Sequence, residues 1–303
     1  MFEFLVTLQQ LCIMFLLVLV GFTLFKIKML NNDTTKDLSN LVVYVAGPCV
    51  TLISFQQEFT MDKLIGFLLC FVYSFVILFI GLLIGKLIFG KEKTLEQYAC
   101  GFSNAGFIGI PLVVGLLGVE YVFYLSAFFV AFNILAWTYG LKLISGKTSI
   151  TFKKFITNPA IFSVIIGIIL FVTQIKIPSI LYTTLDYCGN LNTPIGMIVL
   201  GTYIANGRIK YIFNNADAYK VTFVRCIVVP IICMLLLSFA YTPIVEIKTV
   251  LLIASAAPCG ATLAMFAQMY GNDFSYGSRI VSLSTLFSPF TITLVMTLSH
   301  LLW

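Results

Sequence analysis

Charged residues are scarce in this chain of 303 residues: Asp, Glu, Lys and Arg make up 10% of it, while hydrophobic residues make up 60%. A soluble domain carries about 25% charged residues, so the composition excludes a soluble globular protein. A mean hydropathy of +1.05 indicates an integral membrane protein. The net charge of +6 does not indicate a nucleic-acid partner, because the basic residues are scattered singly among short loops.

Side chains suited to metal binding or catalysis are also rare. The chain has one histidine, His300, and its eight cysteines form no C-x-x-C pair and lie in or beside apolar runs. We therefore expect no metal, no cofactor and no disulfide framework, with the cysteines packed as small hydrophobic side chains. The lack of an acid–base pair within the membrane disfavours a membrane enzyme.

Ionisable groups are predicted to be absent from the middle of the membrane, where a charge costs several kcal/mol and marks a functional site. Asp186 is the exception, about one turn inside the outer end of its helix. It is either an interfacial carboxylate hydrogen-bonded near the helix start or a group that couples a proton or cation. A cation exchanger built on broken helices would place carboxylates where the helices cross, and none is predicted there.

Long apolar runs are abundant. About 20 apolar residues cross the hydrocarbon core, and this length predicts ten transmembrane helices. Their predicted ranges are 5–25, 38–56, 64–89, 95–117, 120–143, 157–174, 181–205, 219–241, 246–270 and 278–302.

The predicted loops divide the basic residues unequally. Fifteen Lys and Arg, Arg225 among them, fall on one side of the membrane, and only Lys63, Lys176 and Lys248 fall on the other. This bias predicts a multi-pass protein of the inner (cytoplasmic) membrane with both termini outside. Five helices in 1–143, a cytoplasmic linker at 144–156 and five helices in 157–303 predict two repeats of inverted topology.

Two of these helices contain breakers at matching places in the two halves. Residues 101–111 include Gly106, Gly109 and Pro111, and residues 254–262 include Pro258. Paired interruptions of this kind are typical of secondary transporters. The polar groups beside them are neutral, namely Ser103, Asn104, Ser255 and Thr262. Neutral donors together with helix starts near Gly109–Pro111 and Pro258 suit an anion.

Motifs along the whole chain resemble the auxin efflux carrier family, whose bacterial members include malate and malonate permeases. The matching segments are Asn-Ala-Gly-Phe-Ile-Gly-Ile-Pro-Leu at 104–112, Asn-Pro-Ala at 158–160, Asn-Thr-Pro-Ile-Gly-Met at 192–197 with Gly201, Ala257-Pro258 through 267–271, and the serine-rich 282–288. The long cytoplasmic loop of the plant exporters is missing, which favours a small carboxylate over auxin as the substrate.

The resemblance implies an all-α fold like that of bile-acid symporters and sodium–proton antiporters, in which helices 4 and 9 cross at their breaks. Helices 1, 2, 6 and 7 would form a scaffold, through which a homodimer is a further expectation, and helices 3–5 and 8–10 a transport domain. Substrate contacts would then come from Asn104, Pro111 and Pro258, with Gly106, Gly109 and Gly260 allowing close backbone approach.

Several alternatives stay open. Pro48 and Pro194, which are placed alike in the two halves, either line the site or kink their helices. Asn104 either contacts substrate or is an interhelical hydrogen-bond donor. Gly109 is either a site residue or a helix contact, and Thr262 and Ser255 either bind substrate or satisfy freed carbonyls. A sodium-coupled symporter of the bile-acid type is the alternative function, and a channel or an enzyme is disfavoured.

Overall fold

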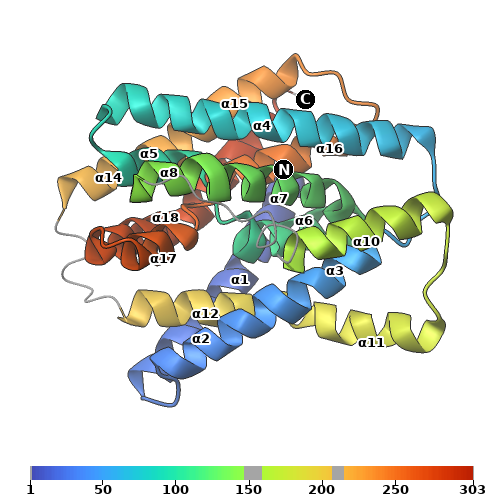
Figure 1. Ribbon diagram of the computed structural model, residues 1–303, viewed down its shortest axis with the longest axis horizontal. Helices are drawn as coiled ribbons and strands as arrows, with labels where there is room; N and C mark the ends of the chain where they lie inside the picture. The colour runs from blue at the N-terminus through green and yellow to red at the C-terminus, as the bar shows by residue number, and fades with distance from the viewer. Residues whose placement is uncertain (1, 147–158, 207–214, 303) are drawn as a thin grey trace.

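The structure is a computed structural model that describes residues 2–146, 159–206 and 215–302 (Figure 1). In these ranges the regular elements are helices. The first half contains α1 (Phe2–Lys26), α2 (Asn32–Leu41), η1 (Val42–Ala46), α3 (Gly47–Ser54), α4 (Met61–Phe89), α5 (Thr94–Gly101), η2 (Ala105–Gly109), α6 (Ile110–Leu116), η3 (Val119–Tyr121), α7 (Val122–Leu135), η4 (Ala136–Gly140) and α8 (Leu141–Ser145). The second half contains α10 (Pro159–Thr173), α11 (Ser179–Asn190), α12 (Asn192–Asn206), α14 (Ala216–Phe223), η5 (Val224–Val228), α15 (Val229–Ser238), α16 (Glu246–Ala256), α17 (Thr262–Met269) and α18 (Phe274–Ser299). Asn158 and most of the predicted linker lie outside the described residues.

Five continuous helices are long and apolar enough to cross a membrane, among the residues that the structure describes. They are Asn32–Ser54, Met61–Phe89, Val119–Ser145, Ala216–Ser238 and Phe274–Ser299. Further apolar helical segments are Cys12–Lys26 within α1, Ala105–Leu116 and Pro159–Thr173. The chain is therefore a helical membrane protein. Of the remaining predicted spans, 5–25 is the continuous helix α1, 157–174 is shorter in the described residues, and the others are interrupted.

Helix starts are set by local capping. Asn31 closes a capping box with Thr34: its Oδ1 accepts the Thr34 N–H at 3.0 Å, and the Thr34 hydroxyl accepts the Asn31 N–H at 2.8 Å. This pairing satisfies N–H groups that a helix start leaves free. The helix consequently begins at Asn32 and not at the predicted residue 38.

Prolines in three helices follow a π-helical turn. The turns and their prolines are Val42–Ala46 before Pro48, Ala105–Gly109 before Pro111, and Val224–Val228 before Pro230. Proline lacks an N–H and its ring clashes with the carbonyl four residues earlier, and the wider π turn relieves that clash. The chain therefore remains helical across these prolines. The predicted helix 181–205, by contrast, is divided into α11 and α12 at Leu191.

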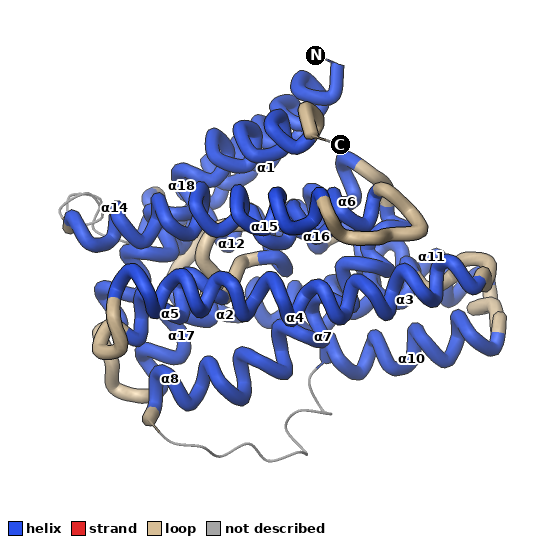
Figure 2. The backbone as a smooth tube through the Cα atoms, turned by 90° about the horizontal axis from the view of Figure 1, so that it is seen from above, coloured by secondary structure: helices blue, strands red, loops and turns tan. Residues whose placement is uncertain are grey.

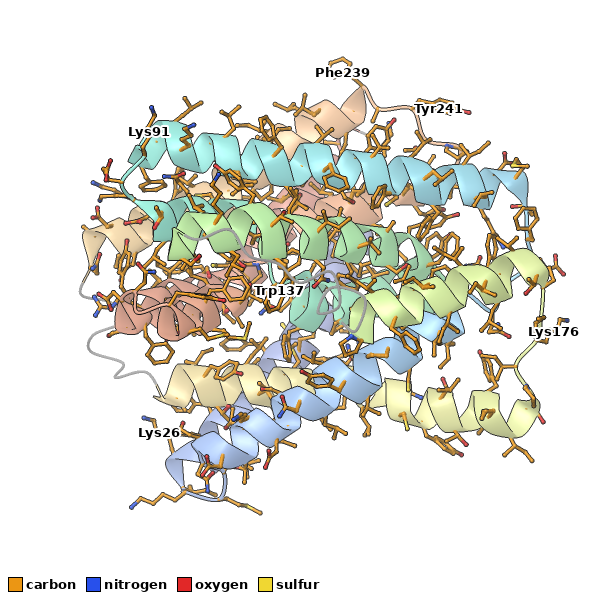
Figure 3. All side chains as sticks on the ribbon, in the orientation of Figure 1. Lys26, Lys91, Trp137, Lys176, Phe239 and Tyr241 are labelled. Atoms are coloured by element: carbon orange, nitrogen blue, oxygen red, sulfur yellow. The ribbon has the colours of Figure 1, made fainter. Side chains whose placement is uncertain are left out.

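The helices run between two opposite ends of the molecule. Figure 1 shows the α4–α5 connection at one end and the α3–α4 and α10–α11 connections at the other. Figure 3 places Lys26 and Lys91 at the first end and Lys176 at the second. The chain termini lie near each other in both Figure 1 and Figure 2. Basic residues predicted on opposite sides of a membrane are thus at opposite ends of the structure.

Two sets of helices pack mainly among themselves. In one set α1 lies along α12, α10 and α11 pack on α3, and α12 packs on α2. In the other, α4 packs on α5 and α7, and α18 packs on α14, α16 and α17. Contacts between the sets include α1 with α18, α10 with α7, and α12 with η2.

The contact between α1 and α12 depends on two glycines. A Cβ at Gly201 would overlap the Val18 carbonyl oxygen, and a Cβ at Gly21 would overlap the Ile198 carbonyl oxygen. The two backbones therefore touch, as small residues allow at helix contacts in membranes.

Replacing Gly201 by Val should separate α1 from α12, because its Cβ would overlap backbone atoms that cannot move aside. We expect a loss of about 1–3 kcal/mol, seen as a lower Tm of the purified protein in detergent. Gly106→Ala is the matched control, since a Cβ at Gly106 meets no atom within 4 Å. An equal Tm for both variants would contradict the close packing of α1 and α12.

Candidate functional site

Two interrupted helices cross, and their open backbones pair with each other. The α5 and α16 helices each give way to a few non-helical residues before η2 and α17 begin. The Asn104 N–H donates to the Pro258 carbonyl at 2.7 Å, and the Gly260 N–H donates to the Phe102 carbonyl at 2.9 Å, in an antiparallel bridge. The two predicted interruptions therefore meet in space.

The residue types at this crossing explain why the backbone can open here. Pro258 has no N–H, and Ala257 before it is extended (φ −56°, ψ 144°), as a following proline favours. At Gly260 an added Cβ would lie 3.1 Å from the Ser103 carbonyl oxygen and 3.3 Å from that of Phe102. Only glycine fits at this spacing without displacing the partner strand.

The first interrupted helix restarts earlier than predicted. We expected its start near Gly109–Pro111, but the π-helical turn Ala105–Gly109 runs directly into α6, which contains Pro111. That turn accommodates the missing N–H of proline, so Pro111 is buried within a helix and does not begin one. The free N–H groups at the crossing belong to the turn that starts at Ala105.

Two polar side chains at the crossing are buried without a hydrogen-bond partner. They are the Ser103 hydroxyl and the Asn104 amide nitrogen, on residues that are 3% and 5% exposed. Leaving such a group unpaired costs about 1–3 kcal/mol. A Cβ at nearby Gly106 would meet no atom within 4 Å, so there is open space beside this turn. The arrangement leaves donors available to a ligand.

Other predicted site residues have partners within the protein. The Thr262 hydroxyl accepts a hydrogen bond from the Tyr98 hydroxyl at 3.0 Å. A Cβ at Gly109 would lie 3.3 Å from the Ala105 Cβ and 3.8 Å from Leu125, so this glycine lies in a packed region. The Thr262 hydroxyl is thus bonded within the protein, and Gly109 packs against neighbouring side chains.

Pro48, Pro194 and Asp186 lie away from the paired backbone. Pro48 is in α3 and Pro194 in α12, both half-buried. Asp186 is half-buried in α11, where its carboxylate accepts a hydrogen bond from the Asn190 amide at 3.2 Å.

The predicted position of Arg225 in a cytoplasmic loop is wrong. Arg225 lies in η5, is 1% exposed and reaches the crossing. Its guanidinium donates to the carbonyls of Cys100 at 2.9 Å, Ser255 at 2.7 Å and Ala257 at 2.9 Å from Nη2 and 3.2 Å from Nε. Because Arg225 reaches the crossing, the expectation that the crossing contains no charged side chain is also wrong. The signal in the sequence is the apolar run 221–229 that surrounds Arg225.

Arg225 and the helix ends together give the crossing a positive character. The carbonyls that Arg225 binds close the C-terminal ends of α5 and α16, which carry roughly half a negative charge each. The ends of η2 and α17 that face the crossing are N-terminal and carry the opposite partial charge. Within the described ranges the ion pairs join Asp217 to Lys93 and Lys220, so Arg225 is bound by neutral carbonyls and not by a carboxylate.

Comparison with known proteins gives two similarities, each extending over nearly the whole chain. A family model described as "Membrane transport protein" matches residues 6–150 and 148–296. An uncharacterized transporter of Methanocaldococcus jannaschii is 26% identical over 303 aligned residues, which cover 93% of this chain and 95% of that protein.

Replacing Arg225 by Met should destabilise the crossing, because three buried carbonyls would lose their donors. We expect a loss on the order of 3 kcal/mol, measured as a lower Tm in detergent. Arg225→Lys should be intermediate, because it restores the charge but not the guanidinium fork.

Lys220→Met is the control for charge removal, since the Lys220 side chain is 70% exposed in the same span. Its effect should be near zero, as for other exposed ion pairs. If Arg225→Met and Lys220→Met unfold at the same temperature, the guanidinium does not support the crossing.

Proposed function

Because this chain belongs to the membrane transport protein family, the auxin efflux carrier family that its motifs indicated, we propose that it is a secondary carrier. Its substrate is a small organic anion, a carboxylate of the malate or malonate type, which crosses the cytoplasmic membrane by alternating access. The anion binds beside the crossing of α5–η2 with α16–α17, where Asn104 is its principal side-chain contact.

One observation carries this proposal: a buried cation and an unpaired amide donor lie at the same helix crossing. Arg225 binds the carbonyl ends of α5 and α16 and so cancels their negative partial charge. The Asn104 amide nitrogen, buried on the N-terminal side of η2, lacks a partner. An anion placed there would accept from Asn104 and from the first N–H groups of η2.

The proposed architecture is ten spans in two inverted repeats, 1–143 and 157–303. The antiparallel backbone pairing of the two interruptions supports it, as does the packing of α11 on α3 and of α12 on α2. Predicted spans 1, 2, 6 and 7, which are α1, α2–α3, α10 and α11–α12, form the proposed scaffold. Predicted spans 3–5 and 8–10, which are α4, α5–α6, α7–α8, α14–α15, α16–α17 and α18, form the proposed transport domain. The two sets of mutually packed helices support this division.

The proposed orientation places the basic end of the molecule in the cytoplasm and both termini outside. Removing Arg225 from the basic loops leaves fourteen Lys and Arg on the cytoplasmic side against three outside. The end of the molecule at which Figure 3 labels Lys26 and Lys91 would then be cytoplasmic, and the end that carries Lys176 would be external. A bias of this size still sets one orientation.

Membrane potential gives this carrier a preferred direction. A potential of about 100 mV, negative inside, is worth roughly 2.3 kcal/mol per charge. Export of an anion can therefore proceed without a coupling ion, whereas accumulation inside requires exchange or a co-transported cation. Asp186 stays the proposed coupling group in the second case.

Binding of small mono- and dicarboxylates should raise the Tm of the purified protein, and Asn104→Ala should weaken the effect. Loss of one hydrogen bond to a charged group, about 1.5 kcal/mol, raises Kd roughly tenfold. Asn40→Ala is the control, because this exposed asparagine lies in α2, which contributes no residue to the crossing. Equal stabilisation of Asn104→Ala and wild type would remove Asn104 from the site; stabilisation by sodium alone would favour the bile-acid symporter type.

Counterflow should distinguish a carrier from a channel. Proteoliposomes preloaded with unlabelled substrate should take up labelled substrate faster than empty ones, because a carrier returns loaded to the other side. Arg225→Lys, where it folds, should reduce the rate, since its ammonium cannot hold both helix ends. Uptake that does not respond to internal substrate would identify a channel.

A further inference from the structure

Asn192, at the start of α12, is buried with neither side-chain polar atom paired. The residue is 2% exposed, and both Oδ1 and Nδ2 lack a hydrogen-bond partner. A buried primary amide offers two donors and an acceptor, and each unpaired group costs about 1–3 kcal/mol. Leucine would fill a similar volume without that penalty, so the position is unfavourable for packing alone.

Asn192 lies where the break between α11 and α12 meets the π-helical turn of the continuous helix Asn32–Ser54. Its Oδ1 lies 3.8 Å from where a Cβ on Gly47 would be, at the junction of η1 and α3. Asn192 itself follows the break at Leu191 between α11 and α12. Here α3 packs on α11 and α2 packs on α12, so the segments α2–η1–α3 and α11–α12 run antiparallel.

The same face of α12 continues to the turn that carries the first site. Gly196 is one helical turn beyond Asn192 and therefore on the same face. A Cβ on Gly196 would lie 3.2 Å from the Phe107 ring, in the η2 turn that Asn104 precedes. The face of α12 that begins at Asn192 thus reaches, one turn later, the η2 turn that Asn104 precedes.

This interface is not fully packed. A cavity of about 20 Å³ lies among α1, η2, α12 and α18, lined in part by Ile108, Met197 and Ser288. Ile108 follows Phe107 and Met197 follows Gly196 in the chain, and neither asparagine is among the residues that line the cavity. A cavity of this size admits about one water molecule, so a bound anion would require α12 and η2 to separate slightly.

We propose that Asn192 is a second substrate-binding residue, which hydrogen-bonds to a polar group at the end of the substrate remote from Asn104. The proposal rests on the carrier function given above and adds a contact from α12, on the opposite side of the interface from η2. The amide can donate to a second carboxylate and accept from a hydroxyl. Asn192 therefore discriminates two-ended substrates from those with a single carboxylate.

The test compares binding of succinate and butyrate, which have equal chain length, to wild type and to Asn192→Leu. We expect the variant to bind succinate about tenfold more weakly, the factor for one hydrogen bond of about 1.4 kcal/mol, and to bind butyrate as wild type does. Asn40→Leu, at an exposed asparagine of α2, is the matched control and should change neither. Unchanged succinate binding, or equal losses for both ligands, would overturn the proposal.

A second variant protects the test against a folding defect. Asn192→Asp keeps the shape and the acceptor but places negative charge beside the bound anion. It should lower succinate affinity more than butyrate affinity, with the effect growing as pH rises and the carboxyl ionises. A pH-independent result with wild-type selectivity would assign Asn192 to structure alone. If neither carboxylate binds the wild type, the carrier proposal itself fails.

Discussion

The structure depends on how two broken helices satisfy their open backbone in a place without water. Each break frees N–H and carbonyl groups that lipid cannot bind. Two cross-strand hydrogen bonds, from Asn104 to Pro258 and from Gly260 to Phe102, pair part of them. The guanidinium of Arg225 binds three further carbonyls at the ends of α5 and α16, those of Cys100, Ser255 and Ala257. A single arginine thus fixes both helix ends relative to each other, and the crossing keeps one geometry.

This arrangement also determines the sign of charge that the crossing attracts. Four helix ends meet there, two negative and two positive, and their partial charges would nearly cancel. Arg225 lies at the negative ends and is bound by carbonyls, without a carboxylate among its bonded partners. The balance therefore shifts toward an anion. Neutral side chains such as Asn104 can then contribute direction and selectivity, while the positive charge comes from Arg225 and from the N-terminal ends of η2 and α17.

Sequence reasoning identified the breaks but not what supports them. Pro258 and Gly260 have local, covalent reasons to open a helix, so the second break was predictable. Pro111 has the same covalent reason, yet the π turn before it keeps the chain helical, and no propensity encodes that turn. Arg225 was misplaced because an arginine near a span end is normally a topology signal. Its long side chain reaches the crossing only because η5 packs against α18 and α5.

Unpaired polar atoms in this protein concentrate where helices are interrupted. Of the six buried side-chain atoms without a partner among the described residues, four belong to Ser103, Asn104 and Asn192. A protein that bound nothing could replace all three with apolar side chains and gain stability. Ser103 and Asn104 directly precede η2, and Asn192 begins the face of α12 that contacts η2, so a ligand between these two elements would pair their free polar atoms. The same interruptions that weaken the fold thus provide hydrogen-bonding groups that only a bound molecule can complete.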